Sequence, residues 1–360
     1  MILERIRSLL EKSPNQKAKA IANGLGCGKT EVNQVLYANQ DTFAQDPVGF
    51  GWSLTALRID FGSNCWLTAE AFEKALTSSG SPLDSSVSRI TFVIGEDCKI
   101  LLEALARMLA ICNQLADAGK LVSVDFQSSG STLTYLNRIG FIDLLRSDVA
   151  ILPKRPRISA AAAYGGNNDG VVELRKIDHI RPDDEIPGLL RNSFVSCAGD
   201  QYNVAAHTVI SELFGNVKEH SGTQSAGFAG LQNYPRAKRH HIQTVISDSG
   251  RGIAGTLMPL LERKYPQVAR KISKSALDHR VALLQEVFSA GGLSQVDDSS
   301  RGLGLKGAGT YAQKYNALIS VRQQDFELRI RHVGSLIEFS HSLDLARIEG
   351  THICFDFFLD

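Results

Sequence analysis

Ser211-Glu-Leu-Phe-Gly-Asn216-Val-Lys-Glu-His220 has the pattern of an amphipathic helix whose polar face carries a carboxylate and a side-chain amide. Glu212 and Asn216 are four residues apart, so they share one side of a helix. An apolar stripe has the same spacing, which favours burial against a sheet: Val209, Leu213 and Val217. A carboxylate beside a side-chain amide suits a hydrated Mg²⁺ ion and the polarisation of a water molecule.

Two glycine-rich segments follow this helix along the chain. Asp248-Ser-Gly250-Arg-Gly252 ends a predicted strand over 241–247, so the chain places one carboxylate there and then turns sharply. Arg301-Gly302-Leu-Gly304-Leu-Lys306-Gly307 leads into a predicted helix over 306–315. Free N–H groups at the positive end of a helix can receive phosphates. One Gly-x-Gly is weak evidence, but three pieces in this order predict a nucleotide site.

Together the three pieces resemble the N, G1 and G2 boxes of the GHKL ATPase superfamily, which includes DNA gyrase B, MutL, sensor histidine kinases and anti-sigma-factor kinases. The resemblance extends over roughly residues 203–360 and implies an ATP-binding α/β sandwich, the Bergerat fold. It implies that Glu212 activates water, Asn216 coordinates Mg²⁺ and Asp248 accepts from the adenine amino group. It also implies a set of cofactor-binding residues, with a lid ending at the last glycine of the third segment: Gly250, Gly252, Arg301, Gly302, Gly304, Lys306, Gly307 and Thr351.

Composition limits the other classes of function. The 360 residues are enough for two or three domains, and a net charge of +1 excludes a strongly basic protein, so nucleic-acid binding needs a local patch. No apolar run approaches the ~20 residues that span a bilayer, which predicts a cytoplasmic protein without membrane contact. Six cysteines are scattered without a Cys-x-x-Cys pair, which argues against a disulfide framework and a zinc site and predicts buried free thiols.

Residues 1–55 have the pattern of a winged helix-turn-helix. Apolar residues repeat at helical spacing over 2–10, further helices begin at Ala18 and Thr30, and 41–54 has the glycines and proline of a wing. The segment Gly24-Leu-Gly-Cys-Gly28-Lys29-Thr30 is not a P-loop, because that motif requires glycine where Asn23 stands, and the segment follows a helix.

Within this unit, Lys29, Asn33 and Tyr37, with Trp52 in the wing, resemble the Zα family that binds left-handed Z-form nucleic acid. The resemblance implies that the first three contact the backbone and a syn base, while the tryptophan supports the tyrosine. Two family positions that often carry basic residues hold Thr30 and Gln34 instead. Z-form binding, binding of ordinary duplex and a protein-docking face therefore all stay open.

Residues 56–155 are expected to form a small α/β domain. The pattern predicts strands over 89–95 and 121–126 and helices over 101–118 and 131–139. The segment loosely resembles STAS-like domains, which suggests a protein partner. In STAS phosphoswitches a serine at a strand-to-helix turn is phosphorylated, and 127–131 is such a turn; helix capping and turn formation are the alternative for its serines.

Residues 156–190 are expected to form a linker, and 191–360 the GHKL domain. A helix is predicted over 261–280, and antiparallel strands over 318–321, 326–332, 335–340 and 352–358. The resulting expectation is a sandwich with helices on one face of a mixed sheet.

Three uses of ATP remain open. The first is a Mg²⁺-dependent ATPase in which nucleotide closes the lid, drives homodimerisation and is coupled to nucleic acid held by the amino-terminal unit; Glu212 favours it. The others are a serine/threonine protein kinase of the anti-sigma type and an ATP-gated scaffold. A sensor histidine kinase is disfavoured, because Pro182 and Pro187 interrupt any helix around His179.

Overall fold

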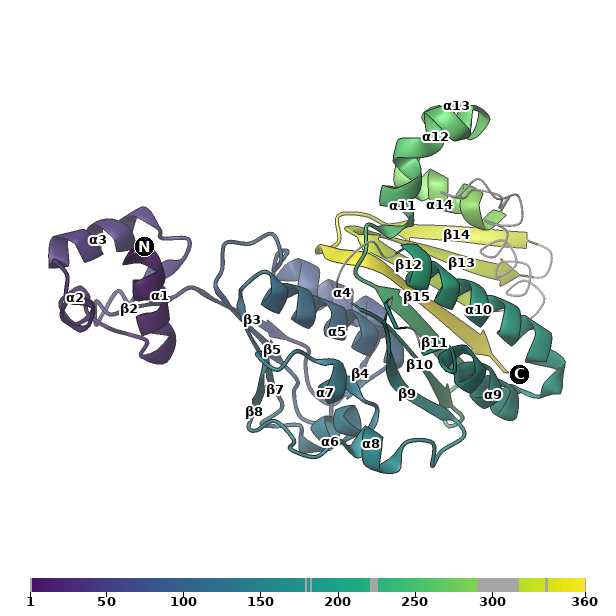
Figure 1. Ribbon diagram of the computed structural model, residues 1–360, viewed down its shortest axis with the longest axis horizontal. Coiled ribbons are helices and arrows are strands. Elements are labelled where there is room, and N and C mark those ends of the chain that lie inside the picture. Colours follow the sequence, from purple (N-terminus) through teal and green to yellow (C-terminus); the bar gives the residue numbers. More distant parts are fainter. Residues whose placement is uncertain are drawn as a thin grey trace.

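The computed structural model describes residues 2–178, 180–181, 183–220, 226–289, 317–333 and 336–359 (Figure 1). The chain is a mixed α/β protein in which a small helical unit stands at one end of two larger layered units. No helix in these ranges is both long enough and apolar enough to cross a membrane.

The small unit contains the three helices and the hairpin that the sequence predicts. These are α1 (Ile2–Lys12), α2 (Ala18–Leu25), α3 (Lys29–Ala38), β1 (Phe43–Gln45) and β2 (Trp52–Leu54). Helix α2 ends because Gly26 adopts a φ of 64°, from which its N–H caps the last turn. Ile6, Val32 and Trp52 are buried in a core of the unit's own.

The middle unit is built on a parallel sheet with the strand order β3-β5-β7-β8. Its strands are β3 (Ala56–Asp60), β5 (Arg89–Val93), β7 (Leu121–Asp125) and β8 (Ala150–Leu152), with a smaller parallel pair of β4 (Trp66–Leu67) and β6 (Lys99–Ile100). Its helices are α4 (Ala69–Ser78), α5 (Leu102–Asp117), α6 (Gly130–Arg138) and α7 (Phe141–Leu144). The four elements predicted over 89–139 are thus confirmed within one or two residues.

The carboxy-terminal unit contains a seven-stranded sheet with the order β14-β13-β12-β15-β11-β10-β9. The strands are β9 (Val171–Ile177), β10 (Gly227–Tyr234), β11 (His241–Asp248), β12 (Ala317–Gln324), β13 (Phe326–Val333), β14 (Leu336–Ser342) and β15 (Ile348–Phe358). Every neighbouring pair is antiparallel, so the expectation of a mixed sheet was wrong. Short turns join β10 to β11 and β12 to β13, and such turns allow only antiparallel neighbours. Strand β9 comes from the segment expected to be a linker.

Helices α9 (Ile186–Ala198), α10 (Asn203–His220), α11 (Gly252–Leu257) and α14 (His279–Ser289) share a core with one face of this sheet. The helix predicted over 261–280 is divided into α12 (Leu261–Lys264) and α13 (Pro266–Ser273), because a residue before proline avoids helical geometry. Short helices complete the described part of the chain: α8 (Ala160–Tyr164), η1 (Asp200–Tyr202) and η2 (Met258–Leu260).

Helix α5 of the middle unit covers the other face of the seven-stranded sheet (Figure 1), so the expectation of helices on one face was also wrong. Of its 16 residues, 13 are buried, because it lies between its own sheet and the larger one. The larger sheet even supplies its amino-terminal cap. The Leu102 N–H donates to the Tyr234 hydroxyl at 2.8 Å, and the Glu103 N–H donates to Gln243 Oε1 at 3.3 Å.

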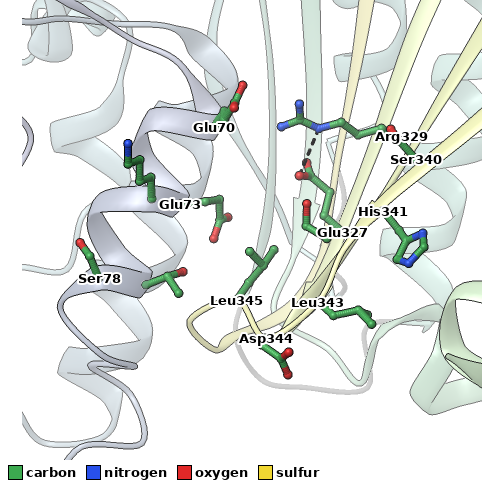
Figure 2. Close-up of a pocket in the computed structure, with 13 residues that line it drawn as sticks. Glu70, Glu73, Ser78, Glu327, Arg329, Ser340, His341, Leu343, Asp344 and Leu345 are labelled. Atoms are coloured by element: carbon green, nitrogen blue, oxygen red, sulfur yellow. Dashed lines mark ion pairs between the residues drawn. The ribbon is translucent and has the colours of Figure 1, made fainter.

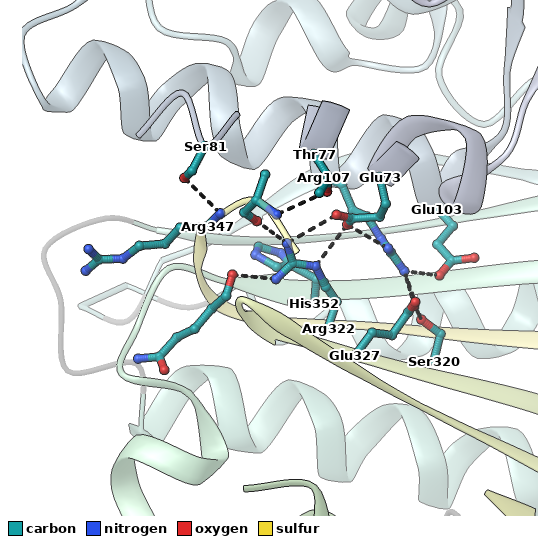
Figure 3. A network of polar contacts seen from close by, with 12 residues as sticks. Glu73, Thr77, Ser81, Glu103, Arg107, Ser320, Arg322, Glu327, Arg347 and His352 are labelled. Atoms are coloured by element: carbon teal, nitrogen blue, oxygen red, sulfur yellow. Dashed lines mark hydrogen bonds and ion pairs between the residues drawn. The ribbon is translucent and has the colours of Figure 1, made fainter. Parts of the chain in front are cut away.

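A buried ionic network links the same two units (Figure 3). The Arg107 guanidinium of α5 donates to Glu73 of α4 at 2.8 Å and to Glu327 of β13 at 2.5 Å. Arg322 of β12 donates to the two carboxylate oxygens of Glu73 at 2.9 and 3.2 Å. Burial lowers the pKa of Arg107, but the carboxylates of Glu103, Glu327 and Glu73 outweigh that effect and raise it. Removing one partner of such a buried pair costs about 3–5 kcal/mol, so the network fixes how the two units fit together.

Candidate functional site

Three side chains from three neighbouring strands form a row at one end of the seven-stranded sheet. Asp248 ends β11 and lies opposite Thr351 of β15, which lies opposite Gln323 of β12. Residues directly opposite each other project to the same face, and this is the face of Ile246 and Ile353, which pack in the core with α10. The sequence-predicted pair Asp248 and Thr351 is therefore side by side.

Hydrogen bonds fix this row. Asp248 Oδ1 accepts from the Gly250 N–H at 2.6 Å. Gln323 Nε2 donates to Thr351 Oγ1 at 3.2 Å, and its Oε1 accepts from the Ala254 N–H at 3.1 Å, which ties the start of α11 to the sheet. Burial raises the pKa of Asp248 to about 6, although the Gly250 N–H and Thr351 oppose the shift. Burial thus favours the protonated form of Asp248 more than solvent would.

Two glycines allow the backbone to close around Asp248. Gly252 has a φ of 75°, and a Cβ there would lie 3.2 Å from the Gln323 side chain. Gly350 has a φ of 98°, and a Cβ there would lie 1.9 Å from the carbonyl oxygen of Asp248. Any other residue at 350 would clash and be strained. The sequence predicts Gly252 as part of the site but does not single out Gly350.

Helix α10 lies along the same face as this row. Its predicted apolar stripe is buried, with Val209, Leu213 and Val217 at most 5% exposed, whereas Glu212 is exposed. A Cβ on Gly227 would meet Val217 Cγ1 at 2.5 Å and the Ser247 carbonyl at 2.6 Å, so the carboxy-terminal half of α10 lies next to the Asp248 end of β11. Asn216 belongs to that half of the helix, and its side chain is outside the described part of the structure.

The phosphate-binding residues predicted from the third glycine-rich segment lie outside the described residues, within 290–316. They are Arg301, Gly302, Gly304, Lys306 and Gly307.

The middle unit contributes a residue that sequence reasoning missed. Gln114 of α5 makes two hydrogen bonds to the backbone of Glu349, and its Nε2 also lies 3.3 Å from Ser249 Oγ. It therefore touches both chain segments that meet at Asp248. One sequence signal was available, since Gln114 is a polar residue within an almost entirely buried helix.

At the amino terminus, α3 presents Lys29, Asn33 and Tyr37 at intervals of four residues. The Tyr37 and Trp52 rings meet edge to face, with centroids 5.0 Å apart. Trp52 is 2% exposed and Tyr37 is 54% exposed, so the buried ring supports the exposed one. At the tip of the hairpin, Phe50 is exposed as well.

The serines of the turn at 127–131, which was expected to be either a phosphorylation site or a helix cap, differ in burial. Ser129 is buried and donates to Thr132 Oγ1 at 2.8 Å, whereas Ser128 and Ser131 are exposed.

A cavity of about 560 Å³ lies between α4 and the strands β13 and β14 (Figure 2). It is not part of the Asp248 row. Glu327, which lines it, is opposite Arg322 and faces α5, on the other side of the sheet from Asp248. Two buried carboxylates line the cavity, and both already have ion-pair partners. Glu73 pairs with Arg107 and Arg322, and Glu327 pairs with Arg107 and Arg329.

No protein-family model matches the chain, and no curated protein is detectably similar to it in sequence.

Proposed function

We propose that the carboxy-terminal unit binds ATP and Mg²⁺ at the Asp248 end of its sheet, as GHKL ATPases do. The observation that supports this most is the row of Asp248, Thr351 and Gln323 beside the end of α10. Asp248 and Thr351 are more than 100 residues apart in the sequence, and both were expected to contact adenine. The row places them side by side.

The chemistry of the row fits an adenine base. Asp248 Oδ1 is held by the Gly250 N–H, so Oδ2 is the oxygen that accepts from the adenine amino group. The Thr351 hydroxyl, next to it on β15, hydrogen-bonds to Asp248 and holds the carboxylate in place for the base. Gly252 and Gly350 keep the backbone beside the carboxylate free of side chains.

In this proposal Asn216 coordinates Mg²⁺ and Glu212 is the general base that activates water. Glu212 precedes Asn216 by one turn of α10 and is exposed, so it is accessible to a water molecule at the γ-phosphate. Nucleotide binding closes the segment that ends at Gly307 and promotes homodimerisation.

The amino-terminal unit is proposed to be a Zα-like winged helix that binds duplex nucleic acid. Support comes from the exposed Tyr37 ring held by Trp52, with Lys29 and Asn33 on the same helix. The middle unit is proposed to be a STAS-like domain that couples the two ends.

The test is to incubate the purified protein with MgATP and to measure ADP, free phosphate and protein-bound phosphate together. Equal amounts of ADP and free phosphate support the ATPase. Phosphate that appears on a protein instead would make it a kinase. ATP binding without turnover would indicate a nucleotide-gated scaffold. The absence of ATP binding at millimolar Mg²⁺ would overturn the proposal.

A further inference from the structure

Cys65 and Cys98 lie side by side where the small parallel pair of strands begins. Their sulfur atoms are 3.2 Å apart. Each cysteine directly precedes its strand, Trp66 lies opposite Lys99, and the Lys99 N–H donates to the Cys65 carbonyl at 2.8 Å. Neighbouring strands are about 4.7–4.9 Å apart, which is within the Cα separation of about 4.4–6.8 Å found in disulfides.

The loops that carry the two cysteines are already packed together. The Gly95 N–H donates to the Gly62 carbonyl at 3.1 Å, and the Asn64 N–H donates to the Glu96 carbonyl at 2.6 Å. A Cβ on Gly95 would lie only 2.3 Å from the Gly62 carbonyl oxygen. A bond between the sulfurs needs them to approach by about 1.2 Å from their separation of 3.2 Å.

The two thiols differ in accessibility. Cys65 is partly exposed, whereas Cys98 is fully buried. Burial, together with the contact to Cys65, raises the pKa of Cys98 to about 12. An oxidant in solution therefore meets Cys65 first, and Cys98 reacts only with its neighbour.

We infer that Cys65 and Cys98 are a redox-sensitive pair that forms a reversible disulfide with a low-molecular-weight disulfide such as oxidised glutathione as the oxidant. The Cys65 thiolate attacks one sulfur of glutathione disulfide and releases one glutathione thiolate. The Cys98 thiolate then attacks the Cys65 sulfur and releases the second. Two protein thiols lose their protons and are oxidised to one disulfide, and the two glutathione thiolates take up those protons.

The position of the pair gives the bond a consequence for the whole molecule. Strand β4 leads directly into α4 and β6 into α5, and these helices carry Glu73 and Arg107. The disulfide would join the starts of the two helices whose side chains hold the seven-stranded sheet. Oxidation therefore fixes α4 relative to α5, the two helices that contact the seven-stranded sheet.

The experiment uses the full-length protein in mixtures of oxidised and reduced glutathione, followed by alkylation and peptide mapping without reduction. We expect a Cys65–Cys98 cross-link, a fall in free thiols from the six cysteines of the chain to four, a higher melting temperature and full reversal by excess reduced glutathione. Cys65 found only as a free thiol or only as a glutathione adduct in folded protein would overturn the inference.

Single substitutions provide the matched controls. Cys98→Ala should leave Cys65 trapped as a glutathione adduct, and Cys65→Ser should leave Cys98 unmodified. Cys197→Ser removes a partly exposed cysteine of α9 and should leave the cross-link intact. If Cys197→Ser abolished the cross-link, the pairing would be wrong. Because the main measurement is made on the unaltered protein, a variant that fails to fold does not decide the outcome.

Discussion

Gln114 on α5 and Glu349 on β15 hold each other by two hydrogen bonds, although 235 residues separate them. The side-chain oxygen of Gln114 accepts from the Glu349 N–H at 2.8 Å, and its amide nitrogen donates to the Glu349 carbonyl at 2.9 Å. Gly350 follows directly and lies against the Asp248 backbone. The middle unit thus positions the backbone on which the proposed adenine site depends.

Gln114→Ala should therefore weaken ATP binding by up to about thirtyfold, because the loss of two hydrogen bonds at about 1 kcal/mol each allows the segment around Gly350 to move. Isothermal titration calorimetry with MgATP measures this loss. The control is Asn113→Ala, which removes hydrogen bonds to Leu144 and Arg146 within the middle unit alone. Equal affinities in the two variants would show that Gln114 has only a general structural role.

Asp248→Asn should lower ATP affinity by about ten- to a hundredfold, since a charge-assisted hydrogen bond contributes about 1.5–3 kcal/mol. The same variant should leave the protein folded. Asp125→Asn is the matched control, because Asp125 also ends a strand and accepts from the N–H two residues later, at 2.9 Å. Wild-type affinity in the Asp248 variant would show that adenine does not bind at this site.

The raised pKa of Asp248 predicts how stability depends on pH. The pKa is 3.8 in an ordinary environment and about 6 in the folded chain. The folded state therefore binds this proton more tightly than the unfolded state does, so the group contributes stability below about pH 4 that is lost as the pH rises through about 6. With a shift of about 2 units, Asp248→Asn should be more stable than the wild type at neutral pH by up to about 3 kcal/mol. Denaturant titrations of both proteins from about pH 4.5 to 7.5 test this, and parallel curves would contradict it.

Glu212→Gln should retain ATP binding and lose turnover by about 10²- to 10⁴-fold, as expected for the loss of a general base. Because Glu212 is exposed, the melting temperature should not change. Glu4→Gln removes an exposed carboxylate from α1 and is the control for charge. Steady-state ADP release measures turnover, and an unchanged rate in the Glu212 variant would exclude it as the base.

Asn33→Ala combined with Tyr37→Ala should abolish duplex binding by the full-length protein, whereas Lys19→Ala on α2 should have little effect. Few charges are present on α3, so the logarithm of affinity should fall with the logarithm of salt by only about 0.9 per phosphate neutralised. Circular dichroism of alternating CG duplexes reports any shift to the left-handed form. Binding without that shift would indicate an ordinary winged helix, and no binding at low salt would indicate a protein-docking face.

The sequence predicted the parts of this structure that local pattern determines. The Asp248 turn and the buried stripe of α10 follow from spacing and residue type over short distances, whereas the pairing of Tyr37 with Trp52 was implied only by the resemblance to the Zα family. Gln114 could not be placed in the same way, because its partner lies 235 residues away. Apolar residues on every side of α5 indicate burial but do not say what covers the helix. The antiparallel direction of the closing strands was predicted from the sequence, whereas the antiparallel pairing of β9 was not, because β9 lies in the segment expected to be a linker.

Helix α5 is covered by its own sheet on one side and by the seven-stranded sheet on the other, so the two larger units cannot be separated without exposing apolar surface. Val245 and Cys354 of the seven-stranded sheet belong to the same hydrophobic core as Leu105 and Met108 of α5. A fragment that began at residue 191 would expose that apolar face to water and would also lose strand β9. Such a fragment should aggregate, whereas a cut near residue 55 should leave a chain that still melts in one cooperative transition.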